Sequence, residues 1–184
     1  NIVELGVFNG TSLLSWAIFS ETFLSTDRYR KVYGFDSFEG LQDFSHEDGK
    51  NIQTSDSEKY VGGYSSKEDF AETFVQLFNE DAVIPNVNRV ELIKGNIFDT
   101  IPPFLDDKPG FKISLLHLDL DLYKPTKFAL DTLYSHVVKG GIIVFDEYGI
   151  PPWEGETHAV DEFLESNKFN KNVMKFNYSS SPGG

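Results

Sequence analysis

The sequence predicts an α/β fold, built as a doubly wound, mostly parallel sheet with helices on both faces. Short apolar runs alternate along the chain with longer segments whose apolar residues recur at helical spacing. The runs ISLL and GIIVF are mostly apolar, as in strands buried on both faces of a parallel sheet. The helical segments between strands suit right-handed crossovers, and 184 residues suffice for one such domain.

Six runs of the chain are predicted strands. They read NIVEL, KVYGFD, RVELIKG, KISLLHLD, GGIIVFDEY and NVMKFNY, at residues 1–5, 31–36, 89–95, 112–119, 140–148 and 172–178. Four segments between them have a helical period, at residues 11–24, 67–80, 124–137 and 156–167. Pro125 falls in the first turn of the third helix, where proline is tolerated. No repeat or linker interrupts this order, so we expect one domain over residues 1–184.

The polar stretch from about Leu41 to Lys67 has no clear period. It is longer than an ordinary connection, and loops of this length are often lids or binding loops. Ser66 is expected to cap the helix that follows, with Asp69 as a weak capping-box partner.

The composition argues against a nucleic-acid or membrane partner. The chain has 29 acidic against 16 basic residues and a net charge of -13, and no basic stripe appears. No run approaches the length of a membrane span, and no signal peptide is visible. The absence of cysteine removes disulfides and thiolate metal sites. It also fits a reducing compartment, so we expect a cytoplasmic location.

Both ends of the sequence look truncated. The chain starts inside a predicted strand without an initiator methionine, and it stops at SSSPGG, which is typical of a hairpin turn without its return strand. We therefore expect a fragment that lacks an N-terminal extension and a last strand.

Each predicted strand except the last ends in polar residues or glycine. In a doubly wound sheet, ligands bind beyond the carboxyl ends of the strands. The residues at these ends are Glu4, Asp36, Gly95 with Asn96, Asp119, and Asp146 with Glu147. Their convergence from five segments predicts a binding site at this edge.

The turn after the first strand reads ELGVFNGTS. Gly6 and Gly10 let a ligand approach the backbone, and Thr11 or Ser12 can cap the following helix. The spacing G-x-x-x-G differs from the dinucleotide fingerprint G-x-G-x-x-G, and a structural tight turn is an equally good interpretation. Glu4 ends a buried strand, where a lone carboxylate is expensive, so we expect it to meet a ligand or backbone donors.

An acid follows the second strand. Asp36 suits the two hydroxyls of a ribose, although an ordinary loop aspartate explains it as well.

Three further acids meet at the ends of the fourth and fifth strands. Asp119, Asp146 and Glu147 would repel one another and resist desolvation. A hard cation such as Mg²⁺, which prefers oxygen ligands, removes both problems. The alternative is a set of solvated loop acids. No zinc spacing occurs, and we expect His117 to pack or hydrogen-bond within its strand.

Tyr123 and Lys127 form Y-x-x-x-K, the proton-transfer pair of short-chain dehydrogenases. Pro125 lies between them at a helix start, and no dinucleotide fingerprint accompanies them, so we set this reading aside.

Five segments resemble, in order, the macrocin O-methyltransferase-like family of class I S-adenosylmethionine-dependent enzymes. They are ELGVFNGTS, GFDSFEGL, HLDLDLYKPT, GGIIVFDEYG and PPWEGETHAVDEF. The Mg²⁺-dependent catechol O-methyltransferase group is a more distant relative. The resemblance covers nearly the whole chain and implies a Rossmann-like methyltransferase sheet.

The resemblance also implies a cofactor site. The segment from Glu4 to Gly10 would hold the methionine part, Asp36 the ribose, Ser37 and Phe38 the adenosine, and Asn96 and Phe98 the adenine. The full expected set is Glu4, Gly6, Gly10, Thr11, Ser12, Asp36, Ser37, Phe38, Asn96, Phe98 and Asp119.

Metal and catalytic roles follow from the same resemblance. Asp119, Asp146 and Glu147 match the family's metal ligands, although the family often has Asp where this chain has Glu147. Asp121 matches a residue proposed as general base in some members, so Asp121 and Asp119 are the expected catalytic residues. The 41–67 stretch would be the substrate lid.

The combined reading is in-line transfer of the methyl group of S-adenosylmethionine to a hydroxyl activated by Mg²⁺. The resemblance suggests a small-molecule acceptor, a sugar or glycosylated natural product. Two alternatives remain, an NAD-binding Rossmann oxidoreductase and a non-catalytic interaction module. The sequence leaves open whether the protein is a homo-oligomer.

Overall fold

Five parallel strands form the centre of the structure, a computed structural model that describes residues 1–49, 63–168 and 174. The strands are β1 (Ile2–Leu5), β2 (Val32–Asp36), β3 (Val90–Lys94), β4 (Ile113–Leu118) and β5 (Val137–Phe145). They pair in the order β3-β2-β1-β4-β5. This order has its switch point between β1 and β4, where a doubly wound sheet binds ligands. The predicted α/β fold is confirmed.

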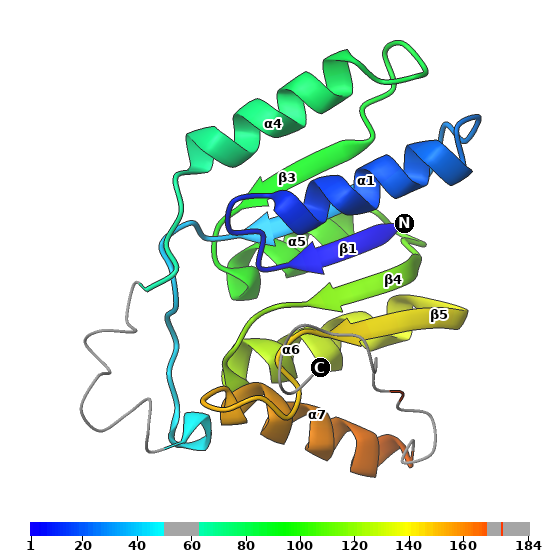
Figure 1. Cartoon of the computed structure of the whole chain (residues 1–184). Coiled ribbons are helices and arrows are strands. Elements are labelled where there is room, and N and C mark those ends of the chain that lie inside the picture. The colour runs from blue at the N-terminus through cyan, green and yellow to red at the C-terminus, as the bar shows by residue number, and fades with distance from the viewer. Residues whose placement is uncertain (50–62, 169–173, 175–184) are drawn as a thin grey trace.

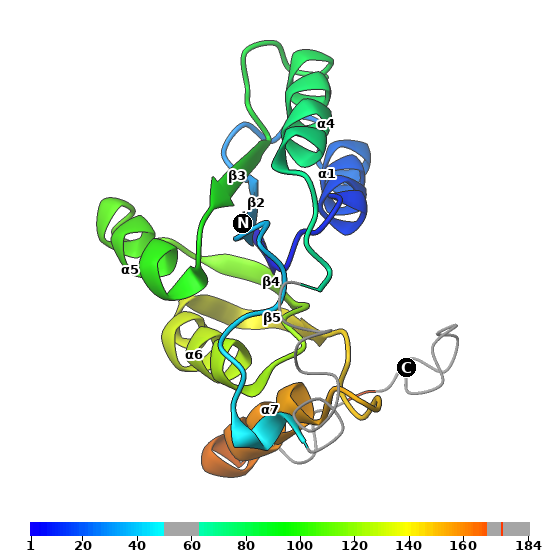
Figure 2. The same ribbon diagram turned by 90° about the vertical axis from the view of Figure 1, so that its left-hand side faces the viewer.

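Helices cover both faces of the sheet (Figure 2). They are α1 (Thr11–Phe23), α4 (Glu68–Glu80), α5 (Ile97–Asp107), α6 (Tyr123–Leu133) and α7 (Glu154–Asn167), with 3₁₀ turns η1 (His46–Asp48) and η2 (Tyr134–His136). One apolar cluster joins α1 and α4 to their face, and a larger one joins α5, α6 and α7 to the other. None of the helices in the described ranges is long and apolar enough to cross a membrane.

Several local predictions are wrong. Our sequence reading assigned no helix between the third and fourth strands, yet α5 lies there and contains Pro102 and Pro103, residues that are rare inside helices. Its start is capped by the Asn96 side chain, which accepts a hydrogen bond from Phe98 N–H. The predicted helix at 124–137 ends at Leu133. The predicted strand at 172–178 lies outside the described residues apart from position 174.

Two predicted helix caps are also wrong. The N-cap of α4 is Lys67, and Ser66 instead donates its hydroxyl to the carbonyl of Phe8 at 2.7 Å. The N-cap of α1 is Gly10, without a side-chain cap, so Thr11 and Ser12 lie inside the helix. The glycine has a φ of 82°, a conformation that an L side chain rarely adopts.

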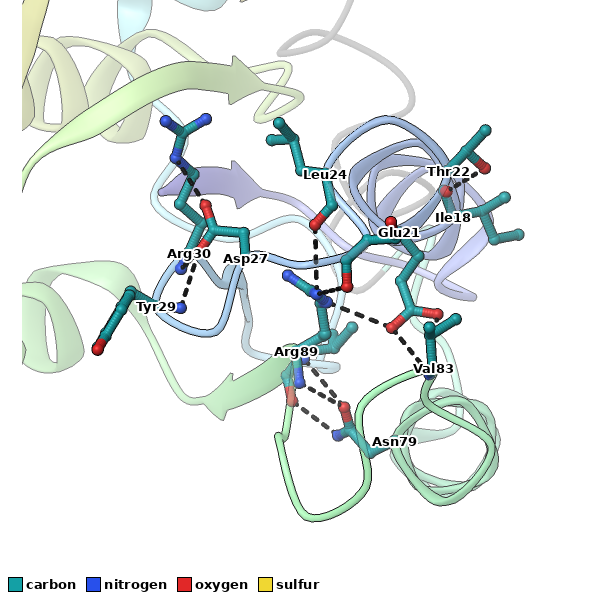
Figure 3. Close-up of polar contacts among 12 residues, drawn as sticks. Ile18, Glu21, Thr22, Leu24, Asp27, Tyr29, Arg30, Asn79, Val83 and Arg89 are labelled. Carbon is teal, nitrogen blue, oxygen red and sulfur yellow. Dashed lines mark hydrogen bonds and ion pairs between the residues drawn. The ribbon is translucent and has the colours of Figure 1, made fainter.

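A buried arginine ties α1 and α4 to β3 (Figure 3). Arg89 is 1% exposed, and its Nε donates to Glu21 Oε1 of α1 at 3.2 Å. The Glu21 carboxylate also accepts the N–H of Val83 just after α4. Asn79 of α4 accepts the N–H of Arg89 at 2.8 Å and donates to the carbonyl of Val90 at 2.9 Å. The Arg89–Glu21 ion pair and the side-chain amide of Asn79 thus join α1, α4 and the start of β3.

Removing Glu21 should leave a buried guanidinium without its counter-ion. We expect Glu21→Ala to lower the free energy of unfolding by about 3–5 kcal/mol, measured by urea denaturation followed by circular dichroism. The double variant Glu21→Ala/Arg89→Met should lose less than the single, because no unpaired charge remains. Asp131→Asn, whose side chain is 66% exposed, is the matched control. A loss below about 1 kcal/mol in Glu21→Ala would contradict this role.

Candidate functional site

A cavity of about 300 Å³ opens at the carboxyl ends of the strands, where we predicted a binding site. Eight predicted residues line it, namely Gly6, Asp36, Ser37, Asn96, Asp119, Asp121, Asp146 and Glu147. Six acidic side chains are among the lining residues, whereas none of those described there is lysine or arginine. The cavity is therefore suited to a ligand that carries positive charge.

The turn after β1 lies directly against the end of β4. Gly6 has a φ of 89°, and a Cβ added to it would sit 1.8 Å from the carbonyl oxygen of Asp119. The backbone of this junction is held by hydrogen bonds from Gly6 N–H to Phe35 and from Asp119 N–H to Leu5, both at 2.9 Å. A side chain at position 6 would force β1 and β4 apart at the switch point.

Asp36 holds this turn to the end of β2. Its Oδ2 accepts the N–H groups of Val7 and Phe8, each at 2.7 Å, and its Oδ1 accepts the N–H of Phe38 at 2.7 Å. The Asp36 carboxylate thus has a structural role that the sequence did not predict, because it holds the backbone of the turn after β1. Each carboxylate oxygen has two acceptor sites, so Oδ1 keeps one for a ligand, and the ribose role stays a prediction.

Glu4 lies behind the cavity, and its partners are side chains. It is fully buried and accepts the Ser12 hydroxyl at 2.8 Å. Its other oxygen lies 3.2 Å from Nδ1 of His117, the residue opposite it on β4. The partners of Glu4 are thus side chains rather than the backbone donors that we expected, and its assignment to the cofactor site stays a prediction.

His117 joins Glu4 to the acids at the cavity. Its Nε2 lies 3.8 Å from Oδ1 of Asp146, while Nδ1 faces Glu4. Burial disfavours the charged ring, but the carboxylates of Asp146 and Glu4 outweigh burial and raise the pKa of His117 to about 10. We predicted that this histidine packs or hydrogen-bonds within its strand; its ring nitrogens instead face carboxylates on β1 and after β5. Its two ring nitrogens link β1, β4 and the end of β5.

Three acids at the ends of β4 and β5 have a raised affinity for protons. Burial, followed by the charge of Asp146, raises the pKa of Asp119 to about 7. Burial and the charge of Asp119 raise the pKa of Asp121 to about 8. The pKa of Glu147 is raised by burial and Asp146. The predicted convergence of these acids is therefore present.

The predicted magnesium ligands do not form a ready coordination shell. Within residues 1–49 and 63–168, no group of three His, Cys, Asp or Glu side chains is arranged to hold a metal ion. The donor chemistry nevertheless fits a hard cation, since Asp119, Asp146 and Glu147 supply only oxygens, and burial and neighbouring acids raise the pKa of Asp119 and Glu147. A cation there would require the side chains to turn toward one point.

Glu156 is an acid of this site that our sequence reasoning missed. It is fully buried in the first turn of α7, and its Oε1 accepts the N–H of Glu147 at 3.0 Å. Its Oε2 has no hydrogen-bond partner among the described residues. Burial and the charges of Asp121 and Asp119 hold its pKa well above the ordinary value. It lies in the segment PPWEGETHAVDEF, but nothing in the local pattern distinguished it from an exposed helix glutamate.

Some predicted cofactor residues lie outside the cavity lining. Gly10, Thr11 and Ser12 start α1 behind the turn. Phe38 packs in the α1/α4 cluster, and Phe98 packs against Phe128 with ring centroids 4.7 Å apart. They are therefore placed to support the site rather than to line it. The assignment of these five residues as direct ligands remains a prediction.

An aromatic wall closes the cavity on the α7 side. Trp153 is 8% exposed, lines the cavity and packs edge-on against Tyr64, whose ring centroid is 5.8 Å away. Tyr148, two residues after Asp146, is not among the lining residues, and its hydroxyl donates to Asp161 at 2.8 Å.

The dehydrogenase-like pair is a surface feature. The Tyr123 hydroxyl donates to Oε2 of Glu162 at 2.9 Å, and Lys127 Nζ lies 3.2 Å from the same oxygen. The pair holds α6 to α7, in agreement with our setting aside of a dehydrogenase reading.

Comparison with known proteins identifies relatives over the whole chain. A family model described as macrocin-O-methyltransferase (TylF) matches residues 1–181. A protein of Streptomyces olivaceus named 8-demethyl-8-(2,3-dimethoxy-alpha-L-rhamnosyl)-tetracenomycin-C 4'-O-methyltransferase is 28% identical over 163 residues. That match covers 86% of this chain but 56% of the relative, so the chain spans little more than half of its length.

Solved structures share the fold. The calicheamicin methyltransferase CalS11 superposes with a TM-score of 0.84 at 26% identity, over 98% of this chain and 69% of that one. The O-methyltransferase NovP superposes with a TM-score of 0.72 at 24% identity, over 98% and 69%.

The raised pKa of Asp121 makes stability depend on pH. The folded chain holds a proton to about pH 8, whereas the unfolded chain releases it near the ordinary value of about 3.9. The favourable contribution is thus complete below about pH 4 and is lost as pH rises through 8.

Asp121→Asn cannot ionise and retains the φ of 61°, which asparagine tolerates. The measured quantity is the melting temperature of Asp121→Asn minus that of the wild type, in metal-free buffer. This difference should be larger at pH 9 than at pH 5 by at least about 2–4 °C. Differential scanning calorimetry measures this difference, and an equal difference at both pH values would contradict the assignment. Asp131→Asn should show no such trend.

Proposed function

The chain belongs to the macrocin-O-methyltransferase family, and from this premise we propose that it transfers the methyl group of S-adenosylmethionine to a hydroxyl of a sugar or glycosylated natural product. The observation that carries the proposal is the cavity at the switch point, where the glycine turn, Asp36 and the acid cluster meet. A sulfonium cofactor with a methionyl ammonium group matches the negative charge of that lining.

The main task of such an enzyme is alignment. The sulfonium methyl is already electrophilic, so holding it in line with the acceptor oxygen can supply roughly 7–11 kcal/mol of barrier reduction. The turn from Gly6 to Phe8 is fixed by Asp36 and suits the methionine part of the cofactor. Ser37 and Asn96 line the neighbouring part of the cavity, where the adenosine would lie.

The second task is to remove a proton. As the oxygen–carbon bond forms and the carbon–sulfur bond breaks, the acceptor hydroxyl releases a proton and the cofactor leaves as neutral S-adenosylhomocysteine. Asp121 is the proposed base, because it lines the cavity and its pKa of about 8 is near the working range of a general base. The neighbouring carboxylate of Asp119 helps to raise the pKa of Asp121.

The acceptor class follows from the names of the relatives and from the aromatic wall. One relative is named for methylation of a rhamnosyl tetracenomycin, and a structure of CalS11, 24% identical to this chain, is described as a TDP-rhamnose 3'-O-methyltransferase. Trp153 and Tyr64 offer apolar faces on which the carbon face of a deoxysugar can pack. TDP-rhamnose is therefore the first acceptor to test.

A divalent cation completes the proposal. Asp119, Asp146 and Glu147 would hold it, and the orphaned oxygen of Glu156 lies within the same charged cluster. When bound, the cation would neutralise part of the carboxylate charge and lower the pKa of the acceptor hydroxyl. Mg²⁺ is the expected ion because all donors are carboxylate oxygens.

Cofactor binding is tested by calorimetry with S-adenosylhomocysteine and with NAD. We expect binding of S-adenosylhomocysteine and none of NAD, since the turn lacks the dinucleotide spacing. Methyl transfer to TDP-rhamnose, followed by mass spectrometry, tests the acceptor class. Binding of NAD alone would overturn the proposal.

The metal is tested by EDTA and by Asp119→Asn. We expect both to abolish methyl transfer while the dissociation constant for S-adenosylhomocysteine changes less than about threefold. Cofactor binding should persist because the glycine turn approaches the backbone carbonyl of Asp119, which asparagine keeps. Turnover that is indifferent to EDTA would remove the metal and leave methyl transfer standing. Loss of cofactor binding in Asp119→Asn would contradict this division of roles.

A further inference from the structure

Residues 40–49, here called the strap, cross the carboxyl edge of the sheet from β2 to α7 (Figure 1). Gly40 to Asp43 line the cavity, so the strap forms part of its wall. At the β3 side, Asp43 Oδ2 accepts a hydrogen bond from Asn96 Nδ2 at 2.9 Å. At the α6 side, the strap ends in η1, whose last residue is Asp48.

Asp48 is fully buried although it belongs to a polar connection. Its Oδ2 accepts both the N–H of Ser45, at 2.5 Å, and the Ser45 hydroxyl, at 3.1 Å. Its Oδ1 accepts the N–H of Tyr123 at 2.7 Å, across 75 positions of sequence. A buried carboxylate is tolerated only with such donors, so these bonds define where the strap must lie.

Tyr123 is the first residue of α6, and the helix has no cap from its own N-cap residue, Leu122. Asp48 therefore satisfies a free N–H of the first turn and places negative charge at the positive end of the helix. The loop that carries Asp119 and Asp121 ends at this point. Fixing Tyr123 fixes the end of that loop.

The fold leaves space for this carboxylate. A Cβ added to Gly155 in the first turn of α7 would lie 2.0 Å from Asp48 Oδ1 and 2.7 Å from Tyr123 N. The next residue, Glu156, donates its N–H to the carbonyl of Asp121 at 3.3 Å. The strap, the acid-bearing loop and the start of α7 thus meet at one hydrogen-bonded carboxylate.

We propose that Asp48 is a positioning residue for methyl transfer, which couples the strap to the loop bearing Asp119 and Asp121. The role rests on the proposed function of the cavity. It acts on the acceptor side, because all residues expected to hold the cofactor except Asp119 are in or just after β1, β2 and β3, whereas Asp48 bonds the start of α6. Asp48 touches no reacting atom and works through the backbone of Tyr123.

The test compares Asp48→Ala, Asp48→Asn and Gly155→Ala in the full chain, with Asp131→Asn of α6 as the control. Asparagine at position 48 keeps one side-chain oxygen, which can accept the Tyr123 N–H. Its amide nitrogen cannot also accept the N–H and hydroxyl of Ser45. Alanine is a better helix former than glycine, so harm from Gly155→Ala reports the collision of its Cβ with Asp48 and with the Tyr123 backbone that Asp48 binds.

For Asp48→Ala and Gly155→Ala, we expect kcat/KM for TDP-rhamnose to fall about tenfold or more. The dissociation constant of S-adenosylhomocysteine should change less than about threefold, and Asp48→Asn should recover part of the loss. Amide exchange over residues 119–126 should accelerate about tenfold in Asp48→Ala, with Asp131→Asn unchanged. If Asp48→Ala does not fold, Asp48→Asn and Gly155→Ala carry the same comparison.

Two results would overturn the proposal. One is unchanged exchange over residues 119–126 in the folded variants. The other is an equal loss of cofactor affinity and acceptor kinetics, which indicates general destabilisation. A wild-type chain that binds S-adenosylhomocysteine but methylates no sugar would refute the proposed acceptor class, while the exchange measurement still decides whether Asp48 orders the acid-bearing loop.

Discussion

The contact between the turn after β1 and the end of β4 is the constraint on which the site depends. Residue 6 is glycine, and its backbone lies so close to β4 that an added Cβ would sit 1.8 Å from the carbonyl oxygen of Asp119. This contact sets the glycine turn, which Asp36 secures from β2, beside the acids of β4 and β5. The cavity exists because three neighbouring strands end at nearly the same level and their turns are tied to one another.

The buried acids of this protein fall into two physical groups. Glu4, Asp36 and Asp48 have donors for their oxygens, from the ring of His117 and the Ser12 hydroxyl, from three backbone N–H groups, and from Ser45 and Tyr123. These acids hold strands and loops in place. Asp119, Asp121 and Glu156 instead lie close to other acids, and the pKa of each is raised by burial and repulsion. Of these three, Asp119 and Asp121 line the cavity and are available to a ligand, whereas Glu156 is fully buried outside its lining.

His117 connects the two groups. It neutralises Glu4 inside the sheet and faces Asp146 at the edge of the cavity. Its charge therefore limits repulsion among the acids without entering the cavity lining. The α1 and α4 layer has its own ionic anchor in Arg89 and Glu21, at the opposite end of the strands (Figure 3).

The sequence by itself determined the α/β class, the five described strands and the presence of Asp36, Asp119, Asp121, Asp146 and Glu147 at one edge. It could do so because apolar periodicity and strand-end position are local properties of the chain. It misplaced the caps of α1 and α4 and missed α5, where a proline pair obscured a helix that its Asn96 cap and packing support.

Only the tertiary structure decided which acids have partners. Asp48 and Tyr123 are 75 positions apart, and Glu4 meets His117 across 113. Neither pair leaves a local signal, because a hydrogen bond between distant segments depends on the register of the sheet and on the path of the strap. The same holds for Glu156, which resembles any exposed helix glutamate until α7 packs it against the acids of β4 and β5. Burial and charge compensation are properties of the assembled chain, and they separate structural acids from those available to a ligand.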